Sequence, residues 1–436
     1  MHARYPPGMG TTEPASAYDV DAIRGRFPAL SRPGPDGQPF VWADAPGGSQ
    51  VPDAVIEAMT GRLRAGSSNA DGSFPLSAEI DDLIAQGHAA GADFLGCDPD
   101  EVVFGQNSTS LLLHLSRSFG RTLREGDEVM VTRLDHDANV RPWILAARDA
   151  GAAVTWVDIT EEDATLDLAS FDAQLSERTR LVAFTLASNA VGTIPGATEL
   201  IRRAKSAGAL VALDGVHLAQ HRSIDLHALG ADVVATSPYK FFGPHLGMLG
   251  VRRAILETWQ PYKLRPVENE NPGRWETGTL SHEAIAGTIA AIEYIAWNGR
   301  RSRMAADRSR RATIVAGFDT FAGHERLLAE RFLIGVAGLP DVRLVGISDL
   351  DRLEERTATF AIRVGDQHPQ DTARGLAARG IFVWDGHYYA IEVFDRLGLL
   401  ESGGAVRIGF CHYHTVDEVD RVLNALEDIA RHGPSA

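Results

Sequence analysis

Short apolar runs alternate with amphipathic stretches along most of this chain. The runs are four or five residues long and rich in Val, Ala and Leu, and stretches with helical spacing of apolar residues separate them, such as 199–207 before Gly208. Short apolar runs bounded by polar turns are typical of strands buried on both faces of a parallel sheet. We therefore predict strands at 129–132, 153–157, 181–185, 210–213 and 232–236.

The alternation of strand and helix predicts an α/β fold whose large domain is built on a mostly parallel, doubly wound sheet. After Trp275 the pattern changes to a long helical stretch, 282–327, followed by shorter strands and helices. This second pattern predicts a smaller α+β domain at the C-terminal end. Its expected strands are 343–346, 357–363, 381–384 and 405–409, and its expected helices are 370–379 and 415–431.

The predicted domain limits follow from these patterns. Residues 1–17 are rich in Pro, Gly, Thr and Ala and are expected to form a flexible tail. The large domain is expected to span 18–295, with its N-terminal segment packed on the small domain, and the small domain 296–436.

Composition narrows the class of protein. The 436 residues carry a formal net charge of −16, which disfavours nucleic acid or an anionic membrane as a partner. We find no apolar run long enough to span a bilayer and no signal-peptide core at the start. Only two cysteines occur, so a disulfide framework is not expected. These features predict a cytoplasmic enzyme.

The most informative polar residues are Asp214 and Lys240. Asp214 ends the apolar run 210–213, and Lys240 lies in the turn Ser-Pro-Tyr-Lys-Phe-Phe-Gly that follows the run 232–236. A lysine in such a turn is suited to a Schiff base, and an aspartate at a strand end is suited to pair with a pyridinium nitrogen. Ligands of doubly wound sheets bind at the carboxyl ends of the strands, where Asp214 falls. The pair therefore predicts a pyridoxal phosphate (PLP) site.

A second polar cluster, Asn107-Ser108-Thr109-Ser110, precedes an apolar helical stretch. Hydroxyls and free N–H groups at a helix N-terminus can bind a phosphate, although a simple helix cap explains the same residues. Two other patterns do not predict a metal site or a dinucleotide site. Cys411-His-Tyr-His414 lacks the second ligand pair of a zinc site, so no metal is expected, and no Gly-x-Gly-x-x-Gly motif predicts dinucleotide binding.

These motifs together resemble the class V aminotransferase family of fold-type I PLP enzymes, and specifically its cysteine desulfurase branch. The resemblance extends from about Asp21 to Ala430. It implies PLP as the cofactor, with Lys240 as the Schiff-base lysine and Asp214 as the partner of the ring nitrogen.

The resemblance also implies roles for the other cofactor residues. Ser108, Thr109, Ser237 and Tyr239 match residues that reach the phosphate, and His136 matches a histidine that lies against the pyridine ring and can assist proton transfer. Gly278 and Thr279 match a loop that reaches the phosphate from a second subunit, which implies a homodimer with shared active sites. Asn189 matches an asparagine that binds the phenolic oxygen of PLP, and His217 is expected to lie near the same oxygen.

The substrate side of the resemblance is less complete. Arg407 matches an arginine that binds the substrate carboxylate, and Gly47 matches a turn near the same group. In the loop 383–390, however, Tyr389 stands where desulfurases carry their catalytic cysteine, and Trp384 stands at the place of an arginine. The aromatic loop residues Trp384, His387, Tyr388 and Tyr389 are expected to line a substrate pocket instead.

A desulfurase without that thiol cannot carry a persulfide. The favoured reaction is therefore β-elimination at the C–S bond of cysteine or an S-substituted cysteine, through a Schiff base with the amino acid. Aminotransfer, epimerisation, or a decarboxylating or oxidative reaction on a specialised amino acid use the same lysine and aspartate, and they remain open. A non-catalytic PLP-binding protein is the least favoured interpretation, because converging Lys, His and Asp groups usually indicate catalysis.

Overall fold

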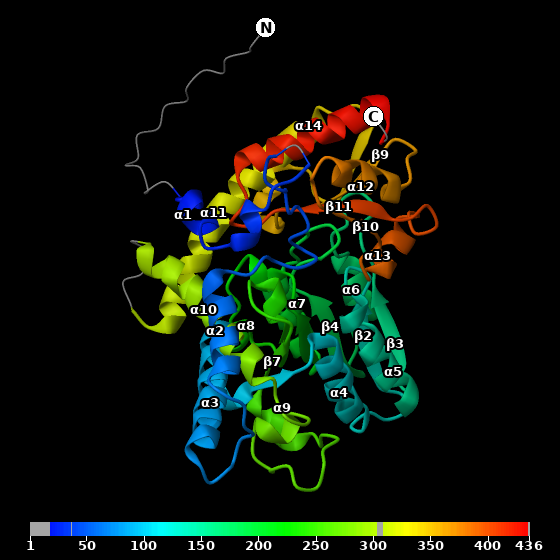
Figure 1. Cartoon of the computed structure of the whole chain (residues 1–436). Helices are drawn as coiled ribbons and strands as arrows, with labels where there is room; N and C mark the ends of the chain where they lie inside the picture. Colours follow the sequence, from blue (N-terminus) through cyan, green and yellow to red (C-terminus); the bar gives the residue numbers. More distant parts are fainter. Residues whose placement is uncertain (1–17, 36, 303–307, 435–436) are drawn as a thin grey trace.

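The computed structural model describes residues 18–35, 37–302 and 308–434, so the predicted tail 1–17 lies outside the described residues. Figure 1 shows a larger helix-covered sheet with a smaller domain on top of it. The larger sheet has seven strands and the smaller sheet has four. This arrangement confirms the predicted α/β fold with a mostly parallel sheet and a smaller α+β domain.

The seven-stranded sheet has the order β1-β7-β6-β5-β4-β2-β3. Strand β7 runs antiparallel to both of its neighbours, and the other pairs are parallel. The predicted strands correspond to β2 to β6. Strands β1 and β7 were not predicted, and β7 contains two glycines, which weaken the apolar pattern of a buried strand. The bounds are β1 Val102–Gly105, β2 Glu128–Thr132, β3 Ala153–Val157, β4 Thr179–Thr185, β5 Leu210–Asp214, β6 Val233–Thr236 and β7 Gly247–Val251.

Successive residues of each central strand enter different hydrophobic cores. In β4, Leu181 and Ala183 belong to one core, whereas Val182 and Phe184 belong to the other. This follows from the two-residue period of a strand, and it explains why these runs are apolar throughout. Helices α4 (Ser108–Gly120) and α5 (Arg141–Ala150) contribute to the first core, and α3 (Pro75–Leu95), α7 (Ala197–Ser206) and α10 (His282–Arg301) to the second.

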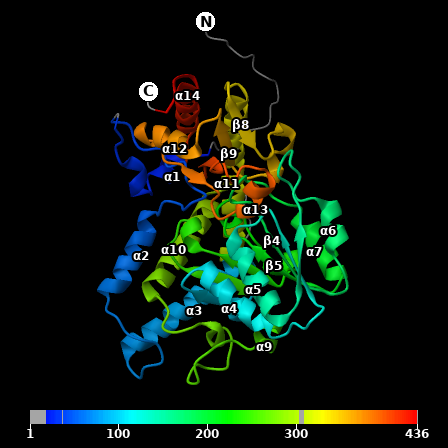
Figure 2. The same ribbon diagram turned by 90° about the vertical axis from the view of Figure 1, so that its right-hand side faces the viewer.

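Figure 2 shows from the side how these helices flank the sheet. Shorter helices complete the large domain, and α2 packs against α10. Their bounds are α1 Val20–Arg24, α2 Asp53–Arg64, α6 Leu168–Gln174, α8 Leu226–Leu229 and α9 Arg253–Thr258. No helix in the described ranges is both long and apolar enough to cross a membrane.

The smaller sheet is antiparallel with the order β10-β11-β9-β8. The predicted helical stretch 282–327 is divided between α10 and α11, and the strand predicted at 381–384 is wrong, because only Trp384 of that range lies in β10. Ile381 instead forms an isolated bridge with Val41. The bounds are β8 Val342–Val345, β9 Thr359–Val364, β10 Trp384–Gly386, β11 Ala405–Gly409, α11 Arg310–Ala337, α12 Pro369–Ala378, α13 Ile391–Arg396 and α14 Val416–His432.

The N-terminal segment reaches the smaller domain. Val41 and Ala43 are fully buried in the core beneath the four-stranded sheet, and Asp44 bridges Gly409 at the end of β11. The predicted boundary between residues 295 and 296 falls inside the continuous helix α10. The segment around Asp44 therefore lies where the two sheets meet.

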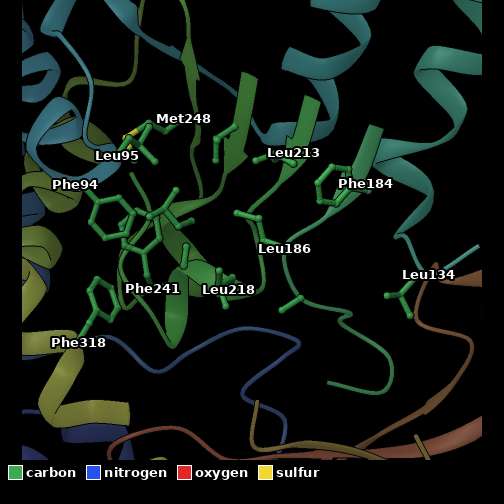
Figure 3. Close-up of a cluster of buried hydrophobic side chains, with 14 of the residues drawn as sticks. Phe94, Leu95, Leu134, Phe184, Leu186, Leu213, Leu218, Phe241, Met248 and Phe318 are labelled. Carbon is green, nitrogen blue, oxygen red and sulfur yellow. The ribbon is translucent and has the colours of Figure 1, made fainter. Parts of the chain in front are cut away.

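Buried side chains anchor the loops that follow the strands. Figure 3 shows Phe94, Phe241 and Phe318 close together beside the strands, and the rings of Phe94 and Phe241 stack with centroids 4.3 Å apart. Phe241 directly follows Lys240, and Leu213 directly precedes Asp214. The hydrophobic core therefore fixes the backbone on which both polar side chains stand.

Candidate active site

A cavity of about 270 Å³ lies at the carboxyl ends of the parallel strands, facing the smaller domain. The segments that follow β1, β2, β4, β5 and β6 all contribute to its lining, as expected for a doubly wound sheet. The structure thus brings together most of the predicted site residues. Those that line the cavity are Gly47, Ser108, Thr109, His136, Asn189, Asp214, His217, Ser237, Tyr239, Lys240, Trp384, Tyr389 and Arg407.

Lys240 ends a short 3₁₀ turn, Pro238–Lys240, directly after β6. Its Nζ donates a hydrogen bond to the carbonyl of Pro46, on the segment between the two sheets. Burial is the main cause that lowers the pKa of Lys240 from 10.5 to about 7, and the nearby Arg407 guanidinium lowers it further. A large part of the lysine is therefore the neutral amine at neutral pH, the form that attacks an aldehyde.

The pH dependence of cofactor loading tests this property of Lys240. Only the neutral amine reacts, so the rate of PLP attachment to the cofactor-free protein should rise with pH and level off above about pH 8, one unit above the pKa. Absorbance stopped-flow at constant ionic strength measures this rate. A rate that keeps rising in proportion to hydroxide up to pH 10 would mean an ordinary lysine pKa.

Asp214 is the last residue of β5 and is buried. Its Oδ1 accepts a hydrogen bond from the Val216 N–H at 2.8 Å. Burial raises the pKa of Asp214 to about 6, and the Val216 bond and the charge of Lys240 oppose this rise. A buried carboxylate of this kind is stabilised by a cationic hydrogen-bond donor, and a protonated pyridine nitrogen is one.

Two loops with hydroxyl side chains meet at one end of the cavity. The Asn107 side chain caps α4 by accepting from the Ser110 N–H at 2.8 Å, and Thr109 is exposed at the same helix end. Ser108 is buried and contacts both the Ser237 hydroxyl and the Thr236 carbonyl, to which it donates at 3.1 Å. Hydroxyls and an N-terminal helix end at one place form a suitable anion site.

His136 lies in the segment after β2 and also lines the cavity. Its Nδ1 accepts from the Ala138 N–H at 3.0 Å, and its ring stacks on that of Tyr389 with centroids 5.4 Å apart. Burial lowers the pKa of His136 to about 4, with Lys240 and Arg407 acting in the same direction. The imidazole is therefore neutral and presents a flat face, as a ring-stacking residue requires.

Two other cavity-lining side chains, Asn189 and His217, hold buried polar atoms that have no partner among the described residues. The Asn189 Nδ2 donates to the Tyr388 carbonyl at 2.9 Å, but the buried Oδ1 has no partner within the described ranges. The His217 Nε2 contacts the hydroxyls of Thr357 and Thr359 at 3.2 and 3.1 Å, while its Nδ1 is unpaired. Buried polar atoms without partners are costly, so both atoms indicate a ligand or ordered water here.

The loop after β10 closes the cavity from the smaller domain. Tyr388 and Tyr389 have φ of +50° and +60°, a conformation that costs free energy for residues other than glycine. Backbone bonds hold it, because the Tyr389 carbonyl accepts from the Asp137 N–H at 2.7 Å and the Tyr388 carbonyl accepts from Asn189. The strained loop thus places the Tyr389 ring at the cavity.

Some predicted residues lie elsewhere. Gly278 and Thr279 are exposed, and Gly278 borders a separate surface hollow beside Tyr262 and Leu264. His387 does not line the cavity, and its Nδ1 accepts from the Tyr389 N–H at 3.2 Å.

Tyr388, a further residue of the predicted aromatic loop, lines the cavity, and the Arg407 guanidinium lies 4.7 Å from the centre of its ring. One contributor to the site, Asp44, was missed by sequence reasoning. Asp44 forms an ion pair with Arg407 at 2.9 Å. In the sequence, Asp44 is visible only as part of the turn Asp-Ala-Pro-Gly. Its partner Arg407 lies 363 residues away in the chain, and no local pattern indicates such a pairing.

The residues present fit PLP. Lys240 offers a neutral amine, Asp214 a buried carboxylate, and Ser108, Thr109 and Ser237 a phosphate site. The unpaired polar atoms of Asn189 and His217 leave room for hydrogen bonds to the phenolic oxygen.

Comparison with known proteins agrees with this geometry. The family model described as "Aminotransferase class-V" matches residues 41–422. The "Probable cysteine desulfurase 2" of Mycobacterium leprae is 32% identical, over 95% of this chain and 98% of that protein. A cysteine desulfurase of Dickeya dadantii is 30% identical over 96% of this chain and 98% of that protein.

The apo structure of the cysteine desulfurase of Thermococcus onnurineus NA1 superimposes with a TM-score of 0.83 and 25% identity, over 94% of this chain and 98% of that one. The match extends over both domains. The chain therefore belongs to the class V aminotransferase family, and it is a PLP-dependent enzyme with cysteine desulfurases among its relatives.

Proposed function

We propose that this enzyme cleaves the C–S bond of cysteine or an S-substituted cysteine by β-elimination, without a protein persulfide. The reaction converts the amino acid and water into a thiol, pyruvate and ammonium. One observation carries the proposal. The residue that the strained loop presents to the cavity is the phenol of Tyr389, and neither of the two cysteines of the chain lines that cavity.

Both cysteines are poorly suited to carry sulfur. Cys411 is fully buried just after β11, and Cys97 follows α3 and does not line the cavity. Burial raises the pKa of both thiols, with nearby acidic groups acting in the same direction. The thiolate is the nucleophilic form of cysteine, so neither side chain is primed to attack a substrate sulfur.

The chain's own residues can perform the remaining steps. When bound, PLP supplies an electron sink for a carbanion at Cα. Lys240, with its lowered pKa, can remove the Cα proton as the neutral amine and later return a proton to a leaving group. Arg407, on β11, can orient the substrate carboxylate, and neutral His136 can keep water from one face of the reacting centre.

Product analysis tests the proposal. The PLP-loaded protein is incubated with L-cystine and a series of S-substituted L-cysteines, and pyruvate and released thiol are measured. Pyruvate and thiol in equal amounts support β-elimination. A spectral change of the cofactor without pyruvate would instead mean that the site accepts amino acids and breaks a different bond.

A change at Tyr389 is expected to alter the choice of substrate. Its ring stacks on His136 at the cavity mouth, so Tyr389→Ala removes a wall of the pocket for the sulfur substituent. The ratio of kcat/KM between S-benzyl- and S-methyl-L-cysteine should change by about tenfold, the effect of roughly 1.4 kcal/mol of lost aromatic contact. An unchanged ratio would exclude Tyr389 from the substituent pocket.

We further propose a homodimer with shared active sites in the cytoplasm. Gly278 and Thr279 are exposed outside their own cavity, and Leu264 beside them is 71% exposed. Sedimentation should give a dimer. Co-expressed Lys240→Ala and Thr279→Asp chains should recover about a quarter of wild-type activity, because half of the dimers then hold one intact site. A monomer, or a mixture as inactive as its components, would contradict sharing.

A further inference from the structure

The guanidinium of Arg407 is already paired within the cofactor cavity. Its Nη2 donates to Asp44 Oδ1 at 2.9 Å and its Nη1 to the Asn189 carbonyl at 3.2 Å, while its Nε is buried without a partner among the described residues. The Arg407 side chain is only 5% exposed and that of Asp44 is 24% exposed. Arg407 lines the cavity, although Asp44 already neutralises its charge.

The backbone fixes Asp44 beside the arginine. Asp44 bridges Gly409 at the end of β11, and its carbonyl accepts from the Gly47 N–H at 2.9 Å. A Cβ at Gly47 would lie 2.2 Å from the Asp44 Oδ2, so only glycine leaves room for this carboxylate against the cavity wall. The negative charge is therefore a built part of the site.

This charge affects every substrate that carries an α-carboxylate. A carboxylate bound to Arg407 comes to lie near the Asp44 carboxylate, because both groups share one guanidinium. Like charges a few ångströms apart in a partly buried site repel each other strongly. A further anionic group on the substrate would add to the repulsion, whereas a cationic group would relieve it.

The cavity mouth is suited to an organic cation. The rings of Trp384 and Tyr389 line the cavity and are 56% and 66% exposed, so their faces are accessible to a ligand. Aromatic faces attract ammonium groups. The formal net charge of −16 also draws cations toward the protein.

We propose that Asp44 makes this pocket select S-substituted cysteines whose substituent carries a positive charge. The selection deepens the proposed C–S cleavage and rests on it for the sulfur position. The selected substrates share a cationic group about three to four bonds beyond the sulfur-bearing carbon, which the Asp44 charge and the aromatic rings would attract. Asp44 is a specificity-determining residue in this assignment and does not touch the bond that breaks.

Methylene analogues separate binding from cleavage. L-Lysine, L-norleucine and L-2-aminoadipate match S-(2-aminoethyl)-, S-ethyl- and S-carboxymethyl-L-cysteine in length, but they lack sulfur and cannot undergo C–S cleavage. Their dissociation constants for the PLP-loaded wild type are measured by calorimetry and cofactor absorbance. These constants should increase in the order lysine, norleucine, aminoadipate. Lysine should bind at least about tenfold more tightly than aminoadipate.

Asp44→Asn keeps a hydrogen-bonding side chain beside Arg407 and removes the charge. The difference between lysine and aminoadipate should shrink to within about twofold in this variant. Glu257→Gln removes one exposed charge on α9, outside the cavity lining, and should leave the difference unchanged. If Asp44→Asn fails to fold, the order of the three dissociation constants in the wild type still tests the charge selection.

Cleavage of the sulfur compounds distinguishes the two proposals. S-carbamoylmethyl-L-cysteine has nearly the same shape as S-carboxymethyl-L-cysteine without its charge, and should be cleaved with the higher kcat/KM. Aminoadipate binding as tightly as lysine, or an unchanged difference in Asp44→Asn, would overturn the charge selection even if pyruvate is formed. If the analogues bind in the predicted order but no S-substituted cysteine gives pyruvate, the charge selection is supported and the C–S cleavage is refuted.

Discussion

Replacing Lys240 by alanine is expected to remove the visible absorbance of the lysine-linked cofactor and to lower kcat by at least about 10³-fold. Lys240 supplies both the amine that holds PLP and the base that removes the Cα proton. Among the cavity-lining residues it is the only lysine, and the hydrogen bond of its Nζ to the Pro46 carbonyl holds it in the cavity. Absorbance spectra and single-turnover rates of the loaded protein measure the two effects.

A matched control is Lys205→Ala, which removes a lysine from α7, outside the cavity lining. Its absorbance and kcat should equal those of the wild type. Added methylamine should partly restore proton transfer in Lys240→Ala but not its covalent attachment, which borohydride reduction and mass spectrometry report. An unchanged visible spectrum in Lys240→Ala would rule out the assignment.

Asp214→Asn is expected to abolish nearly all turnover while making the cofactor-free protein more stable. The amide cannot hold a proton on the ring nitrogen, and loss of this role should cost at least about 10²-fold in kcat. The pKa of Asp214 is raised from 3.8 in the unfolded chain to about 6 in the fold. The folded carboxyl therefore binds the proton more tightly, and stability decreases as the pH rises from about 4 to 6.

The sign of the stability effect follows from this shift. At pH 7 the wild type has lost that stability, up to about 3 kcal/mol for a shift of this size, and the amide does not carry the cost. Thermal unfolding of the cofactor-free protein should therefore give a higher Tm for Asp214→Asn at pH 7, and nearly equal values at pH 4. Retention of most activity, or a lower Tm at pH 7, would exclude the buried-carboxylate role.

The central sheet could be predicted from the sequence because its strands are buried on both faces. Runs such as 181–185 are apolar at every position, and flanking helices with clear spacing leave few other arrangements. Strand β7 escaped prediction because two of its five residues, Gly247 and Gly250, are glycines that lie close to other chain segments. A Cβ at Gly247 would lie 2.4 Å from the backbone of Asn107, and such close packing leaves no mark in local propensity.

The cofactor end of the site was predictable for a related reason. Asp214, His217, Ser237 and Lys240 follow the strands directly, so the order of strands and turns places them at one edge of the sheet. The substrate end depends on contacts between distant segments. The pairing of Asp44 with Arg407 and the strained conformation of Tyr388 arise only when the smaller domain lies against the cavity. Neither follows from a local pattern.

The most direct test of C–S cleavage without a protein thiol is a sulfur and carbon balance in a cysteine-free enzyme. Cys97→Ala/Cys411→Ala is loaded with PLP and supplied with S-(2-aminoethyl)-L-cysteine, and pyruvate, alanine and released thiol are quantified. We predict one pyruvate per thiol, at the wild-type rate and without alanine. Alanine in place of pyruvate would contradict β-elimination. Activity that is lost with the two thiols, while the fold and the cofactor absorbance are retained, would show that a cysteine of the protein takes part in the reaction.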